Sequence, residues 1–298
     1  MKVRFWGTRG SIPTPGAHTV RYGGNTPCVE VRLPNDELVI FDAGTGIRGL
    51  GDHLVATQEP VRAFLAITHP HWDHIQGFPF FKPLFTTGNE ITIVGPESGS
   101  FVLKQVISDV MNKTYFPVKL DELRASIRFT SLNEGTLPVF GGTLSACFVN
   151  HPSLTVGYRI DANGKSIVYI SDNEPFERGR PAGGGGIEQV VLERFMKRTG
   201  DSNGHIYDFA RNADILIHDS TYTPEEYEDH VGWGHSPYVF SLKVAKEAGV
   251  GKLILFHHDH THNDDKVDEI LDHCRKLISD RRYGFECVAA REGMVIEW

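Results

Sequence analysis

Four side chains that can bind a metal ion lie within the six residues from His69 to His74, HPHWDH. This segment comes directly after a predicted strand at Phe64–Thr68. The first two imidazoles are two residues apart, so they project together from an extended chain. The aspartate and the last imidazole fall at the opening of a following turn or helix, so each pair could serve one of two adjacent metal ions. The candidate ligands are His69, His71, Asp73 and His74.

Three later side chains of the same types stand at the ends of predicted strands, namely His151, Asp172 and His257. Strand ends on one edge of a sheet converge, so these residues could meet the HPHWDH segment in one cleft. Taken singly, His151 before Pro152 and Asp172 before Asn173 could each be a turn residue. Together with HPHWDH they indicate a metal site. Imidazole suits zinc, iron and manganese alike, and carboxylate favours harder metals.

His257 belongs to the segment FHHDHTH, which offers three further histidines. We choose His257 because the residue next to the strand should face the cleft. We expect His258, His260 and His262 to lie in a solvated loop.

The motif HPHWDH after a strand resembles the hallmark HxHxDH of the metallo-β-lactamase superfamily, and the later motifs follow in the family's order over essentially the whole chain. The segment Phe41–Gly44 (FDAG) resembles the family's early Asp-Gly turn, which supports the metal loop. The resemblance implies two divalent metal ions, zinc first and manganese or iron as alternatives. It implies a first site of His69, His71, His151 and Asp172. It implies a second site of Asp73, His74, Asp172 and His257.

Two further segments resemble the branch of this superfamily that contains tRNase Z and phosphodiesterases. They are Leu216–Tyr222 (LIHDSTY) and Gly232–Ser236 (GWGHS). In that branch, the histidine matching His235 is thought to protonate the leaving oxygen, oriented by an acidic partner. Asp219 stands where that partner is usually a glutamate, which shortens its reach by one methylene. The resemblance therefore implies three catalytic residues, Asp73 to orient the attacking water, His235 and Asp219.

The interval between His151 and Asp172 argues against tRNA as the substrate. tRNase Z carries a tRNA-gripping arm there, whereas this interval is 21 residues long and contains the hairpin signal Asn163-Gly164. An insertion follows Asp172 instead and includes the glycine-rich segment Arg178–Gly186, which we interpret as a surface loop. The net charge of −8 also disfavours a long polyanion as partner. We therefore expect hydrolysis of a small phosphodiester, such as a cyclic nucleotide or a cyclic phosphate.

Other functions on the same scaffold stay open. A lactonase, a thioesterase or a β-lactamase would need no leaving-group acid at His235. An RNA 3′-processing nuclease and a redox di-iron protein are further alternatives. A non-enzymatic sensor has no need of seven metal ligands, so the complete ligand set argues against it.

The chain of 298 residues has 40% hydrophobic and 23% charged residues, which is typical of a globular protein. Short apolar segments bounded by Gly, Pro, Asn and Asp predict strands. They are Val3–Trp6, Cys28–Leu33, Leu38–Phe41, Phe64–Thr68, Ile91–Val94, Ile127–Leu132, Thr143–Val149, Thr155–Ile160, Ser166–Ile170, Ile215–His218, Lys252–Phe256, Cys287–Ala290 and Met294–Glu297. Apolar spacing of three and four residues predicts helices at Phe101–Met111, Gly204–Ala213, Tyr238–Ala248 and Lys266–Ile278.

We expect one α/β domain over residues 1–298. The resemblance implies a four-layer αββα sandwich, in which two mixed β-sheets are flanked by helices. The apolar runs are too short to span a membrane, and the N-terminus has no apolar segment of signal-peptide length. Four scattered cysteines without a CxxC pair indicate reduced, buried thiols. We therefore expect a cytoplasmic protein without a membrane partner, and we leave open a homodimer.

Overall fold

The computed structural model describes residues 1–99, 102–176 and 202–298. The segment Arg178–Gly186, expected to be a surface loop, lies outside the described residues.

Two seven-stranded mixed sheets pack face to face and form the centre of the molecule. The strands of the first sheet are, in chain order, β1 (Lys2–Gly7), β2 (Cys28–Arg32), β3 (Leu38–Phe41), β4 (Arg62–Ala66), β5 (Glu90–Gly95), β6 (Ser126–Ser131) and β14 (Val295–Glu297). Those of the second are β7 (Gly135–Val139), β8 (Gly142–Phe148), β9 (Val156–Ala162), β10 (Lys165–Ile170), β11 (Ile215–Asp219), β12 (Lys252–Phe256) and β13 (Glu286–Ala289). The strand order is β14-β1-β2-β3-β4-β5-β6 in one sheet and β13-β12-β11-β10-β9-β8-β7 in the other.

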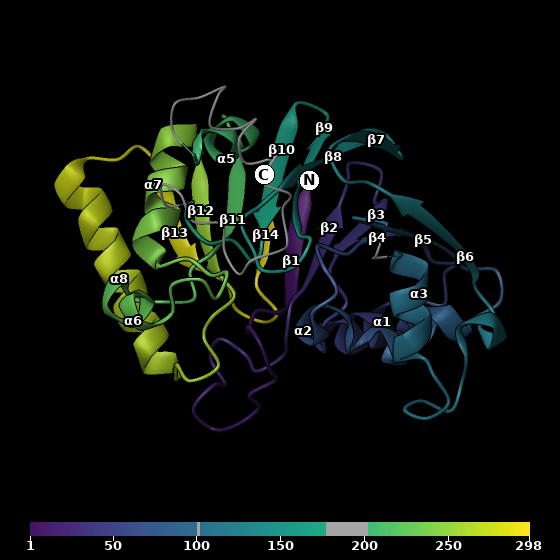
Figure 1. The fold of residues 1–298 in the computed structure, drawn as a ribbon. Coiled ribbons are helices and arrows are strands. Elements are labelled where there is room, and N and C mark those ends of the chain that lie inside the picture. The colour runs from purple at the N-terminus through teal and green to yellow at the C-terminus, as the bar shows by residue number, and fades with distance from the viewer. Residues whose placement is uncertain (100–101, 177–201) are drawn as a thin grey trace.

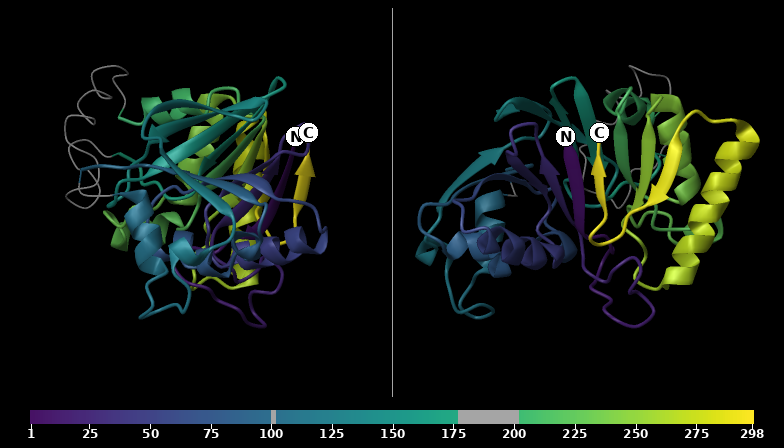
Figure 2. Two further views of the ribbon diagram at one scale, coloured as in Figure 1. Left: turned by 90° about the vertical axis from the view of Figure 1, so that its right-hand side faces the viewer. Right: turned by 180° about the vertical axis from the view of Figure 1, so that it is seen from behind.

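Helices cover the outer faces of both sheets (Figures 1 and 2). The helices are α1 (Gly46–Ala56), α2 (Trp72–Ile75), α3 (Leu103–Val110), α5 (Gly204–Phe209), α6 (Pro224–Asp229), α7 (Tyr238–Ala248) and α8 (Asp264–Arg281). Helices α1 and α3 pack on the first sheet, and α5, α7 and α8 pack on the second. This is the four-layer αββα arrangement that the resemblance implied.

The inner faces of the two sheets bury a common apolar core. On β1 every second residue is buried, the pattern expected of a strand with one face toward a core. All four residues of β3 are buried, because helices cover its other face. Across the core, the rings of Phe41 and Tyr169 stack with centroids 4.8 Å apart, so the carboxyl ends of β3 and β10 lie side by side.

Each sheet contains a group of parallel strands, and the loops after their carboxyl ends carry the candidate ligands except His151, which follows β8. In the first sheet β3, β4, β5 and β6 run parallel, and in the second β10, β11, β12 and β13 do so. The two termini lie beside each other at the opposite end of the sandwich from α2 (Figure 1), where the Met1 amino group donates to the Trp298 carbonyl.

The strand predictions are confirmed to within two residues at each end, and the Asn163-Gly164 turn joins β9 to β10 with φ of 51° and 72°. Strand β7 and helices α1, α2 and α6 lie outside the predicted elements. All four cysteines are free and buried, as expected. None of the helices in the described ranges is long and apolar enough to cross a membrane.

Candidate metal centre

The seven predicted ligands come together in one buried cluster. Four of them lie in the loop after β4 and in the short helix α2, and the others follow β8, β10 and β12. Their donor atoms form overlapping groups of three whose members all lie within 4.8 Å of one another. These groups are His69–His71–His151, His69–His74–Asp172 and Asp73–His74–His257.

Asp172 lies at the centre of this cluster. One of its oxygens, Oδ1, is 3.1 Å from His74 Nε2. The other, Oδ2, is 3.5 Å from His257 Nε2, 3.7 Å from His69 Nε2 and 4.0 Å from His151 Nε2. A carboxylate between both sets of imidazoles can contact two cations at once, which is the bridging position that the resemblance implied.

Several buried donor atoms of the cluster fit a metal ion better than they fit one another. His69 Nε2, His74 Nε2 and Asp172 Oδ1 are buried and have no partner with hydrogen-bond geometry. Buried polar atoms are normally satisfied. Three such atoms, two of them imidazole nitrogens and one a carboxylate oxygen, form the donor set that divalent transition metals bind.

Asp42 fixes the orientation of the HPHWDH segment through hydrogen bonds to His74 and Thr68. Its Oδ2 lies 2.8 Å from His74 Nδ1 and accepts a hydrogen bond from the Tyr169 hydroxyl, and its Oδ1 accepts from the backbone N–H of Thr68. With Nδ1 engaged by a carboxylate, Nε2 of His74 is the nitrogen directed at the cluster. Carboxylates behind ligating histidines commonly set the tautomer and the ring orientation in this way.

His257 and Asp73 form the other side of the cluster. Their Nε2 and Oδ2 atoms are 3.2 Å apart, and the backbone N–H of Ser11 donates to the same carboxylate oxygen. His257 has a φ of 60°, a left-handed conformation that side chains other than glycine seldom adopt. The hydroxyl of Thr221 donates to its carbonyl and lies 3.2 Å from its Nδ1, which holds this backbone turn in place.

His235 and Asp219 lie against the cluster as the resemblance implied. His235 Nδ1 is 3.0 Å from Asp219 Oδ2 and 3.7 Å from Asp172 Oδ2. The shorter aspartate therefore reaches the imidazole from β11. Burial alone would lower the pKa of His235, but the carboxylates of Asp219 and Asp172 outweigh it and raise that pKa to about 9. His235 and Asp219, together with His257, also form a group that could hold a metal ion.

Burial and neighbouring charge set the protonation of the cluster. Burial holds the pKa of His69 well below its usual range. Burial would raise the pKa of Asp172, but the imidazoles of His257, His74 and His69 reverse that effect and lower it strongly. Burial would lower the pKa of His74, but the carboxylates of Asp172, Asp73 and Asp42 outweigh it and raise that pKa well above its usual range. Neutral imidazoles and ionised carboxylates are the forms that bind metals, so a cation bound at His74 would displace its proton.

Three histidines of FHHDHTH do not join the cluster, and the expectation of a solvated loop is wrong for two of them. His258 and His262 are buried. His258 Nε2 lies 2.8 Å from the Ala290 carbonyl, and His262 Nε2 lies 3.0 Å from Glu226. The N-terminal segment covers this loop through the buried Arg9, whose guanidinium donates to the carbonyls of Asp259 and His262. His260 is exposed.

Glu174 is a residue of the site that sequence reasoning missed. Its buried carboxylate accepts hydrogen bonds from the backbone N–H groups of Gly232 and Gly234 and from the Tyr227 hydroxyl. It thereby holds the GWGHS turn, whose Gly234 carbonyl lies 2.9 Å from His151 Nδ1. Its position two residues after Asp172 was the only sequence signal.

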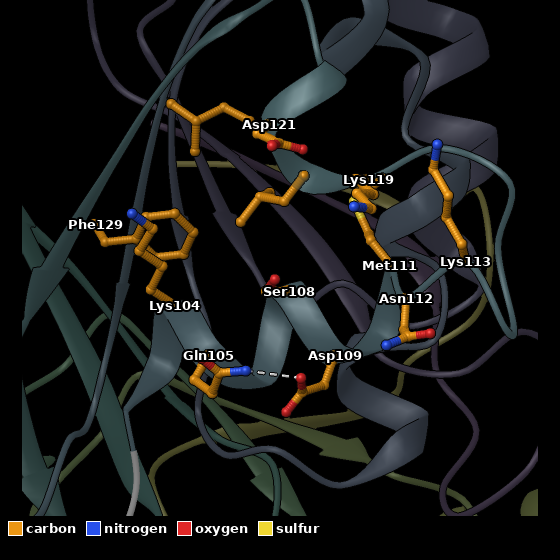
Figure 3. A pocket seen from close by; sticks show the side chains of 12 residues that line it. Lys104, Gln105, Ser108, Asp109, Met111, Asn112, Lys113, Lys119, Asp121 and Phe129 are labelled. Atoms are coloured by element: carbon orange, nitrogen blue, oxygen red, sulfur yellow. Dashed lines mark hydrogen bonds between the residues drawn. The ribbon is translucent and has the colours of Figure 1, made fainter.

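A separate hollow of about 640 Å³ lies between α3 and β6 (Figure 3). Lys104 and Lys119 share its walls with Asp109 and Asp121. A third lysine, Lys113, is paired with Glu122 at 2.8 Å. Acidic groups thus offset the lysines, and the hollow has no part in the cluster.

Comparison with known proteins identifies the family of this chain. The family model described as beta-lactamase superfamily domain matches residues 38–258, which include every candidate ligand. A ribonuclease Z of Thermoplasma volcanium is 27% identical over 279 residues, covering 87% of this chain and 87% of the relative. A ribonuclease Z of Thermoplasma acidophilum is 28% identical over 302 residues, covering 93% and 91%.

Solved structures share the fold at lower sequence identity. The metallo-beta-lactamase fold protein YhfI from Bacillus subtilis superposes with a TM-score of 0.67 at 19% identity, covering 100% of this chain and 98% of its own. Zn(2+)-bound PqqB from Methylobacterium extorquens gives a TM-score of 0.65 at 16% identity and covers 100% of both chains. The chain therefore belongs to the beta-lactamase superfamily and is a hydrolase of the metallo-β-lactamase fold.

Proposed function

We propose that the protein is a phosphodiesterase in which two divalent metal ions and His235 act on the same phosphate group. The observation that carries the proposal is the His235–Asp219 pair, 3.0 Å apart and in contact with the cluster. An alkoxide is a poor leaving group and needs a proton, which a positioned imidazole can give. The thiolate released from a thioester leaves without such a proton, so the pair does not favour thioester hydrolysis.

The ligand set divides between two ions. His69, His71, His151 and Asp172 would hold one, and Asp73, His74, Asp172 and His257 would hold the other. Zinc is our first choice, because seven imidazole and carboxylate side chains suit it and a zinc-bound protein shares the fold. Bound divalent ions would lower the pKa of a water molecule and neutralise the phosphate oxygens.

The chain's own residues would orient the reactants and supply the proton. Asp73, held by the N–H of Ser11, would direct the attacking water toward phosphorus. His235 donates Nδ1–H to Asp219, so Nε2 is the nitrogen left to protonate the departing oxygen. Asp219 is itself fixed by the N–H groups of Asn173 and Thr221, which keeps the imidazole in one orientation.

RNA is the first candidate substrate. The curated relatives that span nine-tenths of this chain are named ribonuclease Z, and this weighs in favour of a nuclease and against the small phosphodiester that the sequence led us to expect.

A small phosphodiester is the second candidate, favoured by one feature of the fold. The structure describes every residue between His151 and Asp172. There the chain forms only the β9–β10 hairpin with its two-residue turn. The net charge of −8 also gives the chain no overall attraction for a polyanion.

Hydrolysis of bis(p-nitrophenyl) phosphate by the zinc-reconstituted protein tests the reaction class. We expect turnover of this diester and none, or far less, of a nitrophenyl acetate, a homoserine lactone and a cephalosporin. Preferential turnover of any of the latter three would contradict the proposal.

A further inference from the structure

Two exposed tryptophans flank the metal cluster. Trp72 stands between His71 and Asp73 in the first motif, and its side chain is 64% exposed. Trp233 precedes Gly234 in the GWGHS turn and is 61% exposed. Tryptophan is highly buried on average, so two exposed indoles beside one site need an explanation.

The imidazole of His151 contacts both of the segments that carry these tryptophans. His151 Nε2 is 3.1 Å from His71 Nδ1, the residue before Trp72. His151 Nδ1 is 2.9 Å from the carbonyl of Gly234, the residue after Trp233. Each tryptophan is thus one residue away from a group that touches the same ring.

Trp233 is braced from behind by other rings. Its centroid lies 4.8 Å from that of His230 at an interplanar angle of 77°. His230 in turn stacks on Tyr222 at 4.5 Å, and its Nδ1 lies 2.6 Å from the Glu226 carbonyl. The indole is therefore supported on one side and open to solvent on the rest of its surface.

Two further exposed apolar side chains stand close in the chain to residues that contact the cluster. Ile12 is 54% exposed and follows Ser11, whose N–H donates to Asp73. Val231 is also exposed and lies two residues before Trp233. A substrate whose phosphate lies at the cluster would cover exposed apolar side chains beside it.

We propose that Trp72 and Trp233 form a stacking site for a nucleobase next to the phosphate that is cleaved. A flat aromatic face binds any base by stacking and needs no hydrogen-bond code. The inference rests on the proposed phosphodiesterase function and specifies its substrate class as nucleotide esters, whether the nucleotide is free or at the end of an RNA chain.

The test compares two esters with the same leaving group, thymidine 5′-(p-nitrophenyl phosphate) and methyl p-nitrophenyl phosphate. The variants are Trp72→Ala and Trp233→Ala. Each should lower kcat/KM for the thymidine ester by about 5- to 150-fold, the range that stacking of one base predicts. The methyl ester, which presents no base, should be hydrolysed at the wild-type rate.

Three controls separate stacking from damage to the site. Trp72→Phe and Trp233→Phe keep a ring and should retain most of the activity on the thymidine ester. Tyr115→Ala removes an aromatic side chain that is 79% exposed in the segment after α3, and it should change neither ester. Metal content should be the same in all variants.

Binding of adenosine monophosphate gives a second readout that needs no turnover. It should quench the tryptophan fluorescence of the wild-type protein, and each alanine variant should bind it more weakly. If the wild type hydrolyses neither ester, the phosphodiesterase proposal fails, and this binding measurement alone decides the stacking site. If the variants lose activity equally on both esters, or on neither, the stacking proposal is wrong while the phosphodiesterase stands.

Discussion

At the residue scale, the cluster gathers more charge and polarity than a buried site can hold without cations. Asp42, Asp73, Asp172 and Asp219 are all buried within contact of six imidazoles. Ionised carboxylates in a protein interior are costly unless they are paired or bind a metal. Two divalent ions would neutralise these carboxylates and occupy the donor atoms that lack partners.

Removal of the proposed proton donor should depend on the leaving group. His235→Ala should slow hydrolysis of an alkoxide ester, such as a dinucleotide, by about 10²–10⁴-fold, the usual contribution of general acid catalysis. It should slow a p-nitrophenyl ester far less, because nitrophenolate departs without a proton. Steady-state kinetics on the two substrates measure the difference.

Metal content distinguishes the remaining roles of His235. It should be unchanged in His235→Ala, since this residue is not one of the seven proposed ligands. Equal losses on both esters would assign His235 to substrate binding or to structure. Loss of one metal equivalent would make it a ligand, as its contact group with Asp219 and His257 would allow.

At the element scale, one carboxylate connects the metal ligands to the proton donor. Glu174 follows β10 and accepts three hydrogen bonds, two of them from the GWGHS turn. That turn holds His151 through the Gly234 carbonyl and carries His235 next along the chain. Glu174 therefore connects the loops after β10 and β11 to each other and to the site.

Glu174→Gln should disturb this connection. The glutamine amide presents N–H groups to backbone donors, so at least one buried donor loses its acceptor, which costs about 1–3 kcal/mol. Urea unfolding should show the loss in stability, and kcat for bis(p-nitrophenyl) phosphate should fall with it. The same change at Glu228, which is exposed on α6, is the matched control and should have no effect. A Glu174→Gln protein as stable and active as the control would mean that the turn holds itself.

The elements themselves were largely predictable, and the exceptions have local causes. Short apolar segments bounded by turn residues predicted the strands, whereas α1 has glycines at three of its eleven positions and shows a weak helical signal. Gly46 is required by packing, since a Cβ there would lie 2.5 Å from the Trp6 carbonyl. Strand β7 contains Pro138, which a sheet accepts here because β7 is an edge strand.

The ligands could be read from the sequence because their spacing is local, but their supports could not. Ser11, Tyr169 and Glu174 reach the site only through pairings between segments distant in the chain, such as Tyr169 with Asp42 across the two sheets. Nothing in the residues around them indicates those partners. The same limit explains the burial of His258 and His262 beneath the N-terminal segment.

At the scale of the whole molecule, the metals should join the two sheets. The first motif follows β4 of one sheet, and His151, Asp172 and His257 follow strands of the other. Ions held between them would therefore stabilise the packing of the two halves. A ligand present at about 100 times its Kd stabilises a fold by roughly 2.7 kcal/mol.

Chelation should accordingly lower Tm. We expect close to two metal equivalents per chain by elemental analysis after reconstitution, and a fall in Tm after treatment with EDTA that added zinc reverses. His257→Ala should retain one equivalent fewer, while His260→Ala, a change to an exposed histidine of the same loop, should retain both. A wild-type protein that never holds more than trace metal would refute the two-metal site.

The charge of the whole surface determines how long a nucleic acid the enzyme can bind. A protein that grips RNA away from the cut gains affinity with each phosphate it neutralises, and that gain falls steeply with salt. This chain carries a net charge of −8 and has only a tight hairpin between His151 and Asp172. The second candidate, a small phosphodiester, therefore predicts that kcat/KM rises from a mononucleotide ester to a di- or trinucleotide and then levels off. Cleavage at the 3′ end of a full pre-tRNA should be no more efficient than cleavage of the trinucleotide, and both should depend weakly on salt.

A kcat/KM that keeps rising to full-length pre-tRNA, with a steep loss between 50 and 200 mM salt, would show that the enzyme holds RNA over a long surface and is a processing nuclease like its named relatives.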